Sequence, residues 1–456
     1  MKIKLPEFEI PEDRPFANDL LHREESAIIL TQLMSTIEQP FVLAIDSSWG
    51  TGKTVFLKMW KQYLKNSGFR VLYFNAWVAD FAEDPFIALV GEIESQIDEI
   101  ESNIEQRGKI KAIFSDVKSK ALPYAKNAFP LLVKIATSGL MDFSNIKRED
   151  IDKFAENLTR EKIEEYEKTK NSINKFKDNL LEFVKELSGE KPVIFFIDEL
   201  DRCRPNFTVS LLEKIKHLFD IPGLIFVLAI DKEQIIHSVR CLYGAEMNSD
   251  GYLRRFIDLD YQLPGIPEGV YVRALFSKYD IDKLFEHAKG NREYVIACLE
   301  CFFDMFDFTL RQQEQIISRL SIVIRLIDVR AKYVGLMCFL ISLKSANNDL
   351  YRKFISSEGN YPEVLDFLDD KSRKHHDKVL LGDICAQIIL SNCLNDVDRE
   401  TAFLNVDSNM SKAQKKEEKE RLAAIKYQME SKIRNDYPSN VIDNITKKIE
   451  LAERFR

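Results

Sequence analysis

The fold of this 456-residue chain is decided by the stretch Phe41-Val-Leu-Ala-Ile-Asp-Ser-Ser-Trp-Gly-Thr-Gly-Lys-Thr54. Its first five residues form an uninterrupted apolar run, which predicts a short strand buried in a parallel sheet. A loop of small residues follows, and apolar residues then recur at helical spacing over 54–64. A strand, a glycine-containing loop and a helix in this order are the elements of a phosphate-binding P-loop.

The loop carries the groups that a nucleoside triphosphate requires. Gly50 and Gly52 let the backbone approach phosphate oxygens because they have no Cβ, Lys53 can reach the β- and γ-phosphates, and Thr54 offers its hydroxyl to Mg²⁺. We therefore expect bound ATP and Mg²⁺, with ATP preferred over GTP because no Asn-Lys-x-Asp guanine-reading element follows. The expected nucleotide-binding residues are Trp49, Gly50, Thr51, Gly52, Lys53, Thr54 and Val55. Ser47 departs from the usual pattern, which has glycine at that position and so no Cβ in the first turn of the loop.

A second apolar run ends in two acids. Ile194-Phe-Phe-Ile197 leads into Asp198 and Glu199, which places both carboxylates at the carboxyl edge of the predicted sheet. There Asp198 can hold Mg²⁺ or a water bound to it, and Glu199 can orient and deprotonate the attacking water. The alternative for Glu199 is a structural acid that pairs with Arg202 or Arg204.

Two further residues are candidate sensors of the γ-phosphate. Asp231 ends the apolar run 223–230, beside the acid-tipped strand, where it could also position water. It equally suits the N-cap of the helix predicted to begin near Lys232. Arg311 stands in a helix that Thr309 is expected to cap, and it could fold back onto the nucleotide as a second sensor.

Strand signals alternate with helical stretches through the first part of the chain. The apolar runs 41–45, 70–74, 192–197 and 223–230 predict an α/β fold with a parallel sheet. Helical periodicity is also visible over 86–106, and after Pro264 it dominates, including 268–290, 292–305, 309–346, 376–394 and 410–434. The predicted division is 1–106 for the N-terminal half of a P-loop NTPase core, 107–190 for a helical insertion, 191–266 for the C-terminal half of the core, 267–346 for a helical lid domain and 347–456 for a C-terminal helical region.

Composition limits the location and the partners. The formal net charge of −8 argues against a wholly basic nucleic-acid binder, although a local basic patch stays compatible with it. The longest apolar stretches, near 121–142 and 333–343, are interrupted or too short to span a bilayer, so we expect no transmembrane helix. Seven cysteines in mostly apolar contexts, with no signal peptide, are typical of reduced thiols in a cytoplasmic protein.

Taken in order, separated motifs resemble the KAP family of P-loop NTPases over roughly residues 19–330. They are W-G-T-G-K-T at 49–54, F-N-A-W at 74–77, D-E-L-D-R-C at 198–203 and a spaced run from Asp231 to Pro264. Glu199 stands where the family usually has a second Asp. The resemblance implies ATP hydrolysis by a switch or assembly device. Bacterial members occur in phage exclusion and defence systems, so it also makes an anti-phage role an expectation.

Three functions stay open. The first is an ATP-hydrolysing switch, and the second is a nucleotide-dependent scaffold with little turnover that recruits an effector or assembles at a membrane. Both imply a protein partner, and a homo-oligomer would let Arg254 or Arg255 act across subunits, with surface salt bridges as the alternative for these arginines. The third is a nucleic-acid-stimulated ATPase that uses the lysines between 109 and 134.

Overall fold

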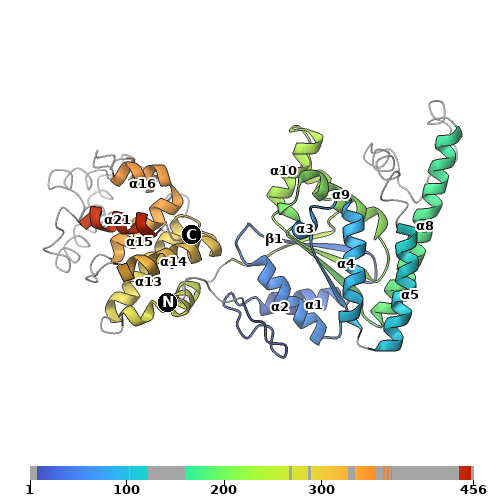
Figure 1. The fold of residues 1–456 in the computed structure, drawn as a ribbon, viewed down its shortest axis with the longest axis horizontal. Helices are drawn as coiled ribbons and strands as arrows, with labels where there is room; N and C mark the ends of the chain where they lie inside the picture. Colours follow the sequence, from blue (N-terminus) through green and yellow to red (C-terminus); the bar gives the residue numbers. More distant parts are fainter. Residues whose placement is uncertain are drawn as a thin grey trace, which may run out of the picture. The chain divides into compact units, whose positions relative to one another are not determined.

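The computed structural model describes residues 8–101, 103–121, 160–265, 270–285, 289–326, 334–355, 363–364, 367–368, 371 and 441–452. They form two compact units, one spanning Phe8–Gly265 and one built from the described residues after Gly265 (Figure 1). We describe each unit by itself. The finer division into five segments stays a prediction.

The N-terminal unit is built on a five-stranded parallel sheet with the order β2-β3-β4-β1-β5. The α/β fold and four of the strands were predicted, and they are confirmed. The fifth strand was missed because its Leu-Asp-Tyr-Gln sequence lies at the sheet edge with mostly exposed side chains, so it has no continuous apolar run. The strands are β1 Phe41–Asp46, β2 Val71–Asn75, β3 Val193–Asp198, β4 Leu224–Ile230 and β5 Leu259–Gln262.

Helices cover both faces of this sheet, because the side chains of each central strand alternate between two apolar clusters. Ile194 and Phe196 of β3 pack with the helices α1 Glu24–Met34 and α2 Lys53–Asn66. Phe195 and Ile197 face the opposite cluster, to which the other main helices contribute. These are α4 Pro85–Ile100, α9 Pro205–Leu218 and α10 Lys232–Tyr243 (Figure 1). Shorter helices connect the strands, namely α3 Ala76–Ala79, η2 Leu200–Arg202 and α11 Ser249–Leu253.

The insertion between the P-loop strand and the acid-tipped strand is helical, as predicted. Its described part consists of α5 Ile104–Ala121 and α8 Arg160–Ser188, which run side by side with Phe114 against Phe183 at 4.9 Å between ring centroids (Figure 1). The single helix predicted over 86–106 is wrong in extent. The first helix ends at Ile100, after which Glu101 is extended, and the Asn103 side chain begins the next helix by accepting the amides of residues 105 and 106. Residues 122–159, with most of the apolar stretch near 121–142, lie outside the described residues.

The C-terminal unit is helical and has one apolar core. Thr309 caps its central helix, since its hydroxyl accepts the Gln312 amide at 3.4 Å while the Gln312 side chain accepts the Thr309 amide at 2.9 Å. The helices expected over 376–394 and 410–434 lie outside the described residues. None of the described helices of the chain is long and apolar enough to cross a membrane. The elements of the unit are α12 Val270–Lys278, η3 Asp282–Phe285, α13 Lys289–Met305, α14 Leu310–Leu326, α15 Val334–Ala346, α16 Asn348–Ile355 and α21 Val441–Ala452.

Phe176 of α8 attaches the insertion to the sheet core, because its ring contacts Phe86 at 5.3 Å and Phe219 at 5.9 Å. We expect Phe176→Ala to lower the free energy of unfolding of the N-terminal unit by about 3–5 kcal/mol. The three tryptophans, at positions 49, 60 and 77, all lie in this unit, so their fluorescence during urea unfolding reports on it alone. The control is Phe81→Ala, whose ring is 87% exposed and whose loss should change stability by less than about 0.5 kcal/mol. Equal losses in both variants would contradict the role of Phe176.

Candidate functional site

The P-loop connects β1 to α2 with two glycines in the left-handed region. Gly50 has φ 78° and Gly52 has φ 88°, conformations that side chains with a Cβ rarely adopt. Ser47 is not among the described residues with positive φ, so the serine in place of glycine introduces no backbone strain. Its hydroxyl donates to Thr51 Oγ1 at 2.7 Å, and the Thr51 hydroxyl donates to the Ser48 carbonyl at 2.8 Å. These contacts tie the two sides of the loop together.

Lys53 begins α2 and folds back over the loop. Its Nζ donates to the carbonyl oxygens of Ser47 and Ser48, the latter at 3.0 Å. Burial lowers the pKa of the Lys53 ammonium below its ordinary value, although nearby carboxylates, chiefly Asp201 and Asp231, raise it. The ammonium group is therefore satisfied by the loop itself, and a bound triphosphate would replace these carbonyl contacts.

Asp198 ends β3 almost fully buried. Its Oδ2 accepts the Tyr73 hydroxyl at 2.8 Å, its Oδ1 accepts the Glu199 amide at 2.9 Å, and Thr54 hydrogen-bonds the same carboxyl group. Burial raises the pKa of Asp198, while the hydrogen bonds from Tyr73 and Thr54 lower it. The two residues expected to hold the metal, Thr54 and Asp198, are thus brought together.

This pair fits Mg²⁺ by its chemistry. A hydroxyl and a carboxylate are hard oxygen donors, and Mg²⁺ is commonly held by one or two protein groups together with waters and substrate phosphates. Within the described part of the chain no three His, Cys, Asp or Glu residues gather as a complete metal cage. A metal here would therefore depend on oxygens that the nucleotide brings.

Glu199 lies next to Asp198 in a strained conformation. Its φ of 59° is left-handed, which costs a non-glycine residue about 1–3 kcal/mol and is typical of functional sites. Its Oε2 accepts the Asn75 side-chain amide at 3.1 Å, and its Oε1 pairs with Arg202 at 2.8 Å. The ion pair with Arg202, weighed as the structural alternative for Glu199, is thus observed. Both carboxylate oxygens of the expected catalytic base have partners in this state.

The F-N-A-W motif supplies this support. Asn75 ends β2, where its Oδ1 accepts the Val78 amide at 3.1 Å as the cap of α3 while its amide group holds Glu199. Trp77, on α3, has its ring 5.6 Å from the Arg202 guanidinium. In the sequence, this motif was singled out only by the resemblance to the KAP family, and no role was predicted for it. The structure places it around the carboxylate at the tip of the acid strand.

The role of Asp201 was also missed. One oxygen of its buried carboxylate accepts the Trp49 indole N–H at 2.6 Å and the Asp231 amide at 3.0 Å. Burial raises the pKa of Asp201, and the attraction of Lys53 lowers it. The carboxylate therefore fastens the P-loop tryptophan to the end of β4. Its place in the D-E-L-D-R-C motif was a signal, but the contact joins residues too distant in sequence to be read from it.

Asp231 caps α10, as one of its two predicted roles requires. Its side chain accepts the Gln234 amide at 3.4 Å, and its buried position follows β4, the neighbour of β3. Its role as a γ-phosphate sensor stays a prediction.

The contacts described above involve none of the candidate arginines. Arg254 pairs with Asp250 at 2.8 Å while 75% of its side chain is exposed, which is the surface salt bridge named as its alternative, and Arg255 is exposed. Arg311 lies on α14, in the C-terminal unit, so its action on the nucleotide stays a prediction.

The raised pKa of Asp198 gives a stability prediction. Since the folded chain binds this proton more tightly than the unfolded chain, the ionised carboxylate destabilises the fold at pH values above its folded pKa. Asp198→Asn should therefore raise the Tm of the nucleotide-free N-terminal unit at neutral pH. The gain should shrink as the pH falls through the folded pKa toward the ordinary value of 3.8.

Tryptophan fluorescence melts over a pH series would measure this gain. Asp250→Asn is the matched control, because the Asp250 side chain is 44% exposed and its ion pairs lower its pKa, so its neutralisation should give no rise in Tm. A Tm of Asp198→Asn at or below that of the wild type at neutral pH would contradict the desolvation of Asp198.

Comparison with known proteins places this site in a family. The KAP family P-loop domain matches residues 23–327. The phage T7 exclusion protein of Escherichia coli (strain K12) is 24% identical over 289 residues, which cover 59% of this chain and 35% of that relative. The chain thus spans about a third of the length of this curated relative.

Solved structures give only distant likenesses. The Aeropyrum pernix ORC2 protein in its ADPNP–ADP complexes has 11% identity and a TM-score of 0.35, over 98% of this chain and 96% of that one. The ORC1 protein of the same organism in complex with DNA has 11% identity and a TM-score of 0.34, over 99% and 87% of the two chains. We draw nothing from similarities at this level.

The family match covers more than half of the chain and contains the P-loop, the F-N-A-W motif and the acid-tipped strand. Nucleotide binding at the P-loop follows from it. This chain belongs to the KAP family of P-loop NTPases.

Proposed function

We propose that this chain is an ATPase that uses ATP binding and hydrolysis as a switch, and that it acts in bacterial defence against phage. The observation that carries the ATPase is the placement of Glu199, held in a strained conformation beside the Thr54–Asp198 pair. A P-loop protein that only senses nucleotide has no need of a carboxylate at this point. The defence role is supported by the similarity to the phage T7 exclusion protein, over about a third of that protein.

Each group at the site has one task in this proposal. The loop amides and Lys53 bind the triphosphate, and Thr54 with Asp198 hold Mg²⁺, which supplies neutralisation of phosphate charge. Glu199 orients the attacking water and accepts its proton at a carboxylate oxygen. Asp231, fixed by its cap contact with α10, presents a polar group beside the γ-phosphate.

The partners of Glu199 support a switch rather than constant turnover. Asn75 contacts one of its oxygens and Arg202 the other, so these two residues set the position of the carboxylate, while each oxygen keeps a lone pair for water. A movement of the F-N-A-W segment would therefore shift the Glu199 carboxylate and change the rate of hydrolysis. A passive scaffold would show the same occupied carboxylate, which keeps that function as the second candidate.

A protein partner fits the surface of this segment. Directly after Asn75, the side chains of Trp77, Val78 and Phe81 are 53%, 68% and 87% exposed. Neighbouring exposed apolar side chains of this kind mark interaction sites in many proteins. A partner bound here would contact α3, whose cap is the residue that holds Glu199.

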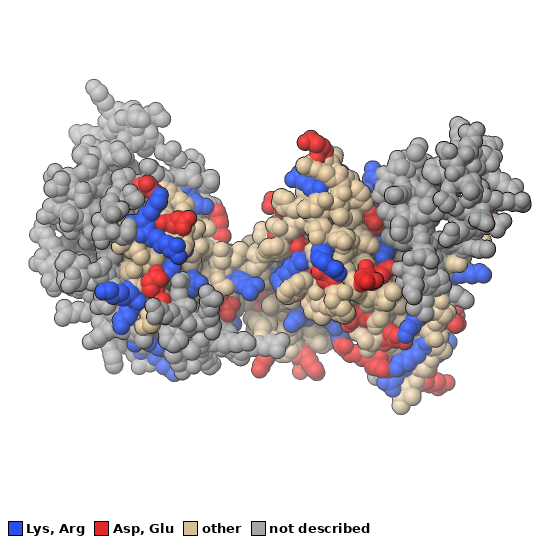
Figure 2. All heavy atoms as spheres, turned by 45° about the horizontal axis from the view of Figure 1, so that its top comes forward, with Lys and Arg blue, Asp and Glu red and all other residues tan. Residues whose placement is uncertain are grey.

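Stimulation by nucleic acid has less support. The lysines of the 109–134 stretch whose side chains the structure describes form ion pairs with acids, at 2.7 Å each. The pairs are Lys109–Glu186, Lys111–Asp98 and Lys118–Glu94. On the face of the N-terminal unit seen in Figure 2, basic and acidic side chains are interspersed over the described surface. Phosphate binding would have to displace these acids.

Replacing the expected general base tests the proposal. We expect Glu199→Gln to keep ATP affinity while lowering steady-state phosphate release by about 100-fold or more, because the amide cannot accept the proton from water. ATP binding can be followed by the fluorescence of the tryptophans at 49 and 77, which lie in the P-loop and the F-N-A-W motif.

Two variants serve as controls. Lys53→Ala should lose ATP binding itself, and Glu190→Gln, an exposed glutamate at the opposite end of β3, should leave both binding and turnover unchanged. Equal turnover by Glu199→Gln and Glu190→Gln would contradict the catalytic role of Glu199. Wild-type phosphate release no faster than that of Lys53→Ala, alone and with candidate partners, would favour the scaffold.

A further inference from the structure

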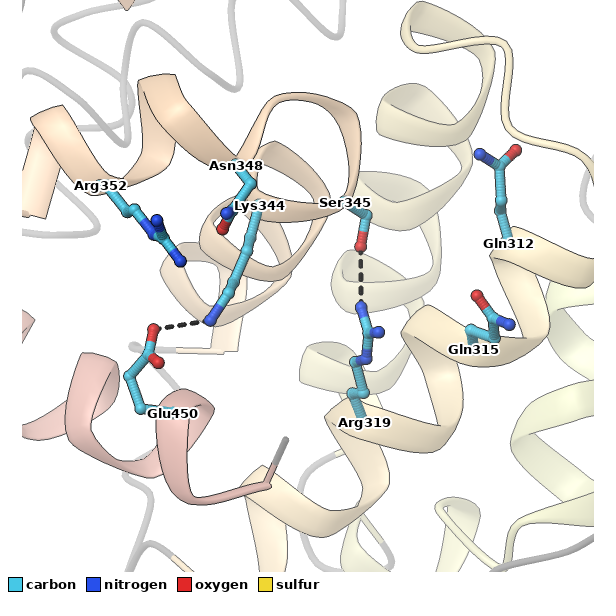
Figure 3. A pocket seen from close by; sticks show the side chains of 8 residues that line it. All are labelled: Gln312, Gln315, Arg319, Lys344, Ser345, Asn348, Arg352 and Glu450. Atoms are coloured by element: carbon cyan, nitrogen blue, oxygen red, sulfur yellow. Dashed lines mark hydrogen bonds and ion pairs between the residues drawn. The ribbon is translucent and has the colours of Figure 1, made fainter. Parts of the chain in front are cut away.

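The C-terminal unit contains a polar cavity that the P-loop chemistry does not use. It has a volume of about 360 Å³ and is bounded by side chains of α14, α15, α16 and α21 (Figure 3). Ligand pockets commonly begin at about 300 Å³, so a small molecule fits. Most of its lining residues lie beyond position 327, where the family match ends. The inference therefore stands apart from the proposed ATPase.

The charges in the cavity are mainly positive. Its lining includes the bases Arg319, Lys344 and Arg352 against one acid, Glu450, and the rest is amide or hydroxyl. Arg319 donates to the Ser345 hydroxyl at 3.2 Å, and Lys344 pairs with Glu450 at 2.6 Å. Within the described residues no acid pairs with Arg319 or Arg352. Two guanidinium groups thus have no counter-charge among the residues that the structure describes.

These cations come from different helices and line the same cavity. Figure 3 shows the charged ends of Lys344 and Arg352 directed toward the side of the cavity where the Glu450 carboxylate lies. Lys344 is nearly buried and lies 4.9 Å from the Tyr351 ring centroid, which fixes the position of its ammonium. Arg319 contributes from α14, across from the helices that carry the other two. A ligand with phosphate groups in the cavity would have cations on both sides of it.

We propose that this cavity binds a small phosphorylated ligand, with its phosphate groups on Arg319, Lys344 and Arg352. Guanidinium groups match phosphate oxygens in bidentate geometry and suit such recognition better than a point charge alone. Asn348, in the first turn of α16, adds a polar group where a helix N-terminus favours anions. A recess of this size with amide-rich walls suits a mononucleotide-sized molecule rather than a nucleic-acid duplex.

Glu450 gives the proposal a distinctive consequence. Its carboxylate forms an ion pair with the ammonium of Lys344, so a phosphate that enters the cavity must compete with this carboxylate. Neutralising Glu450 removes that competitor and leaves the cavity more positive. Ligand affinity should therefore rise when Glu450 is replaced, whereas an acid that only supports the structure would not have this effect.

The test uses the full chain with Lys53→Ala, so that the P-loop does not contribute its own phosphate binding. Isothermal titration calorimetry with inorganic pyrophosphate and with a nucleoside 5′-monophosphate, at physiological salt, measures the affinity. We expect Arg319→Gln with Arg352→Gln to weaken binding by about tenfold or more, and Glu450→Gln to strengthen it several-fold. Lys353→Gln is the matched control. Lys353 lies on α16, the helix that carries Arg352, but outside the cavity lining. Its replacement removes one positive charge, and the affinity should not change.

Three outcomes would overturn the proposal. They are no binding of either probe at millimolar concentration, equal affinity in the double arginine variant and in Lys353→Gln, or unchanged or weaker affinity in Glu450→Gln. Binding of a single-stranded oligonucleotide alone, with neither small probe bound, would assign the cavity to nucleic acid and equally overturn it. Far-ultraviolet circular dichroism checks that the helices of each variant are intact, and Glu450→Gln keeps the test decisive if the double variant fails to fold.

Discussion

The ammonium group of Lys53, at the carboxyl edge of the sheet, is attracted by the carboxylates of four aspartates. They are Asp46, Asp198, Asp201 and Asp231. Three of these carboxylates are buried, and burial raises the pKa of Asp198 and Asp201, with repulsion from Glu199 adding to the effect at Asp198. Such an excess of negative charge opposes a triphosphate, which would add more of the same sign. We therefore expect a nucleotide to bind together with a divalent cation, for which the Thr54–Asp198 pair would provide oxygens.

The hydrogen bonds of the site hold this unfavourable arrangement in place. Asp201 accepts hydrogen bonds from the P-loop and from the end of β4, so one desolvated carboxylate links these two parts of the candidate site. Asn75 and Arg202 do the same for Glu199, whose left-handed backbone stores further strain. Backbone strain and buried charges both destabilise a fold, and in proteins they cluster at functional sites.

The sequence predicted what depends on local pattern and missed what depends on strand order. Strands β1 to β4 are apolar because helices cover both of their faces, whereas β5 lies exposed at the edge and gave no such run. The helix break near Asn103 was missed because a capping asparagine within a long polar stretch resembles any other surface residue. Thr54 and Asp198 were paired by their motifs, but the contacts of Asp201 and Asn75 required knowing that β4 lies between β1 and β3 and that β2 lies beside β3.

The dependence of ATP affinity on Mg²⁺ tests the central claim most directly. Tryptophan fluorescence titrations of the wild type and of Asp198→Asn, each with Mg²⁺ and with a chelator, give four dissociation constants. The account predicts that Mg²⁺ tightens ATP binding to the wild type by about tenfold or more, and that Asp198→Asn loses most of this gain because the buried charge is gone. Equal affinity of the wild type for ATP with and without Mg²⁺ would contradict it.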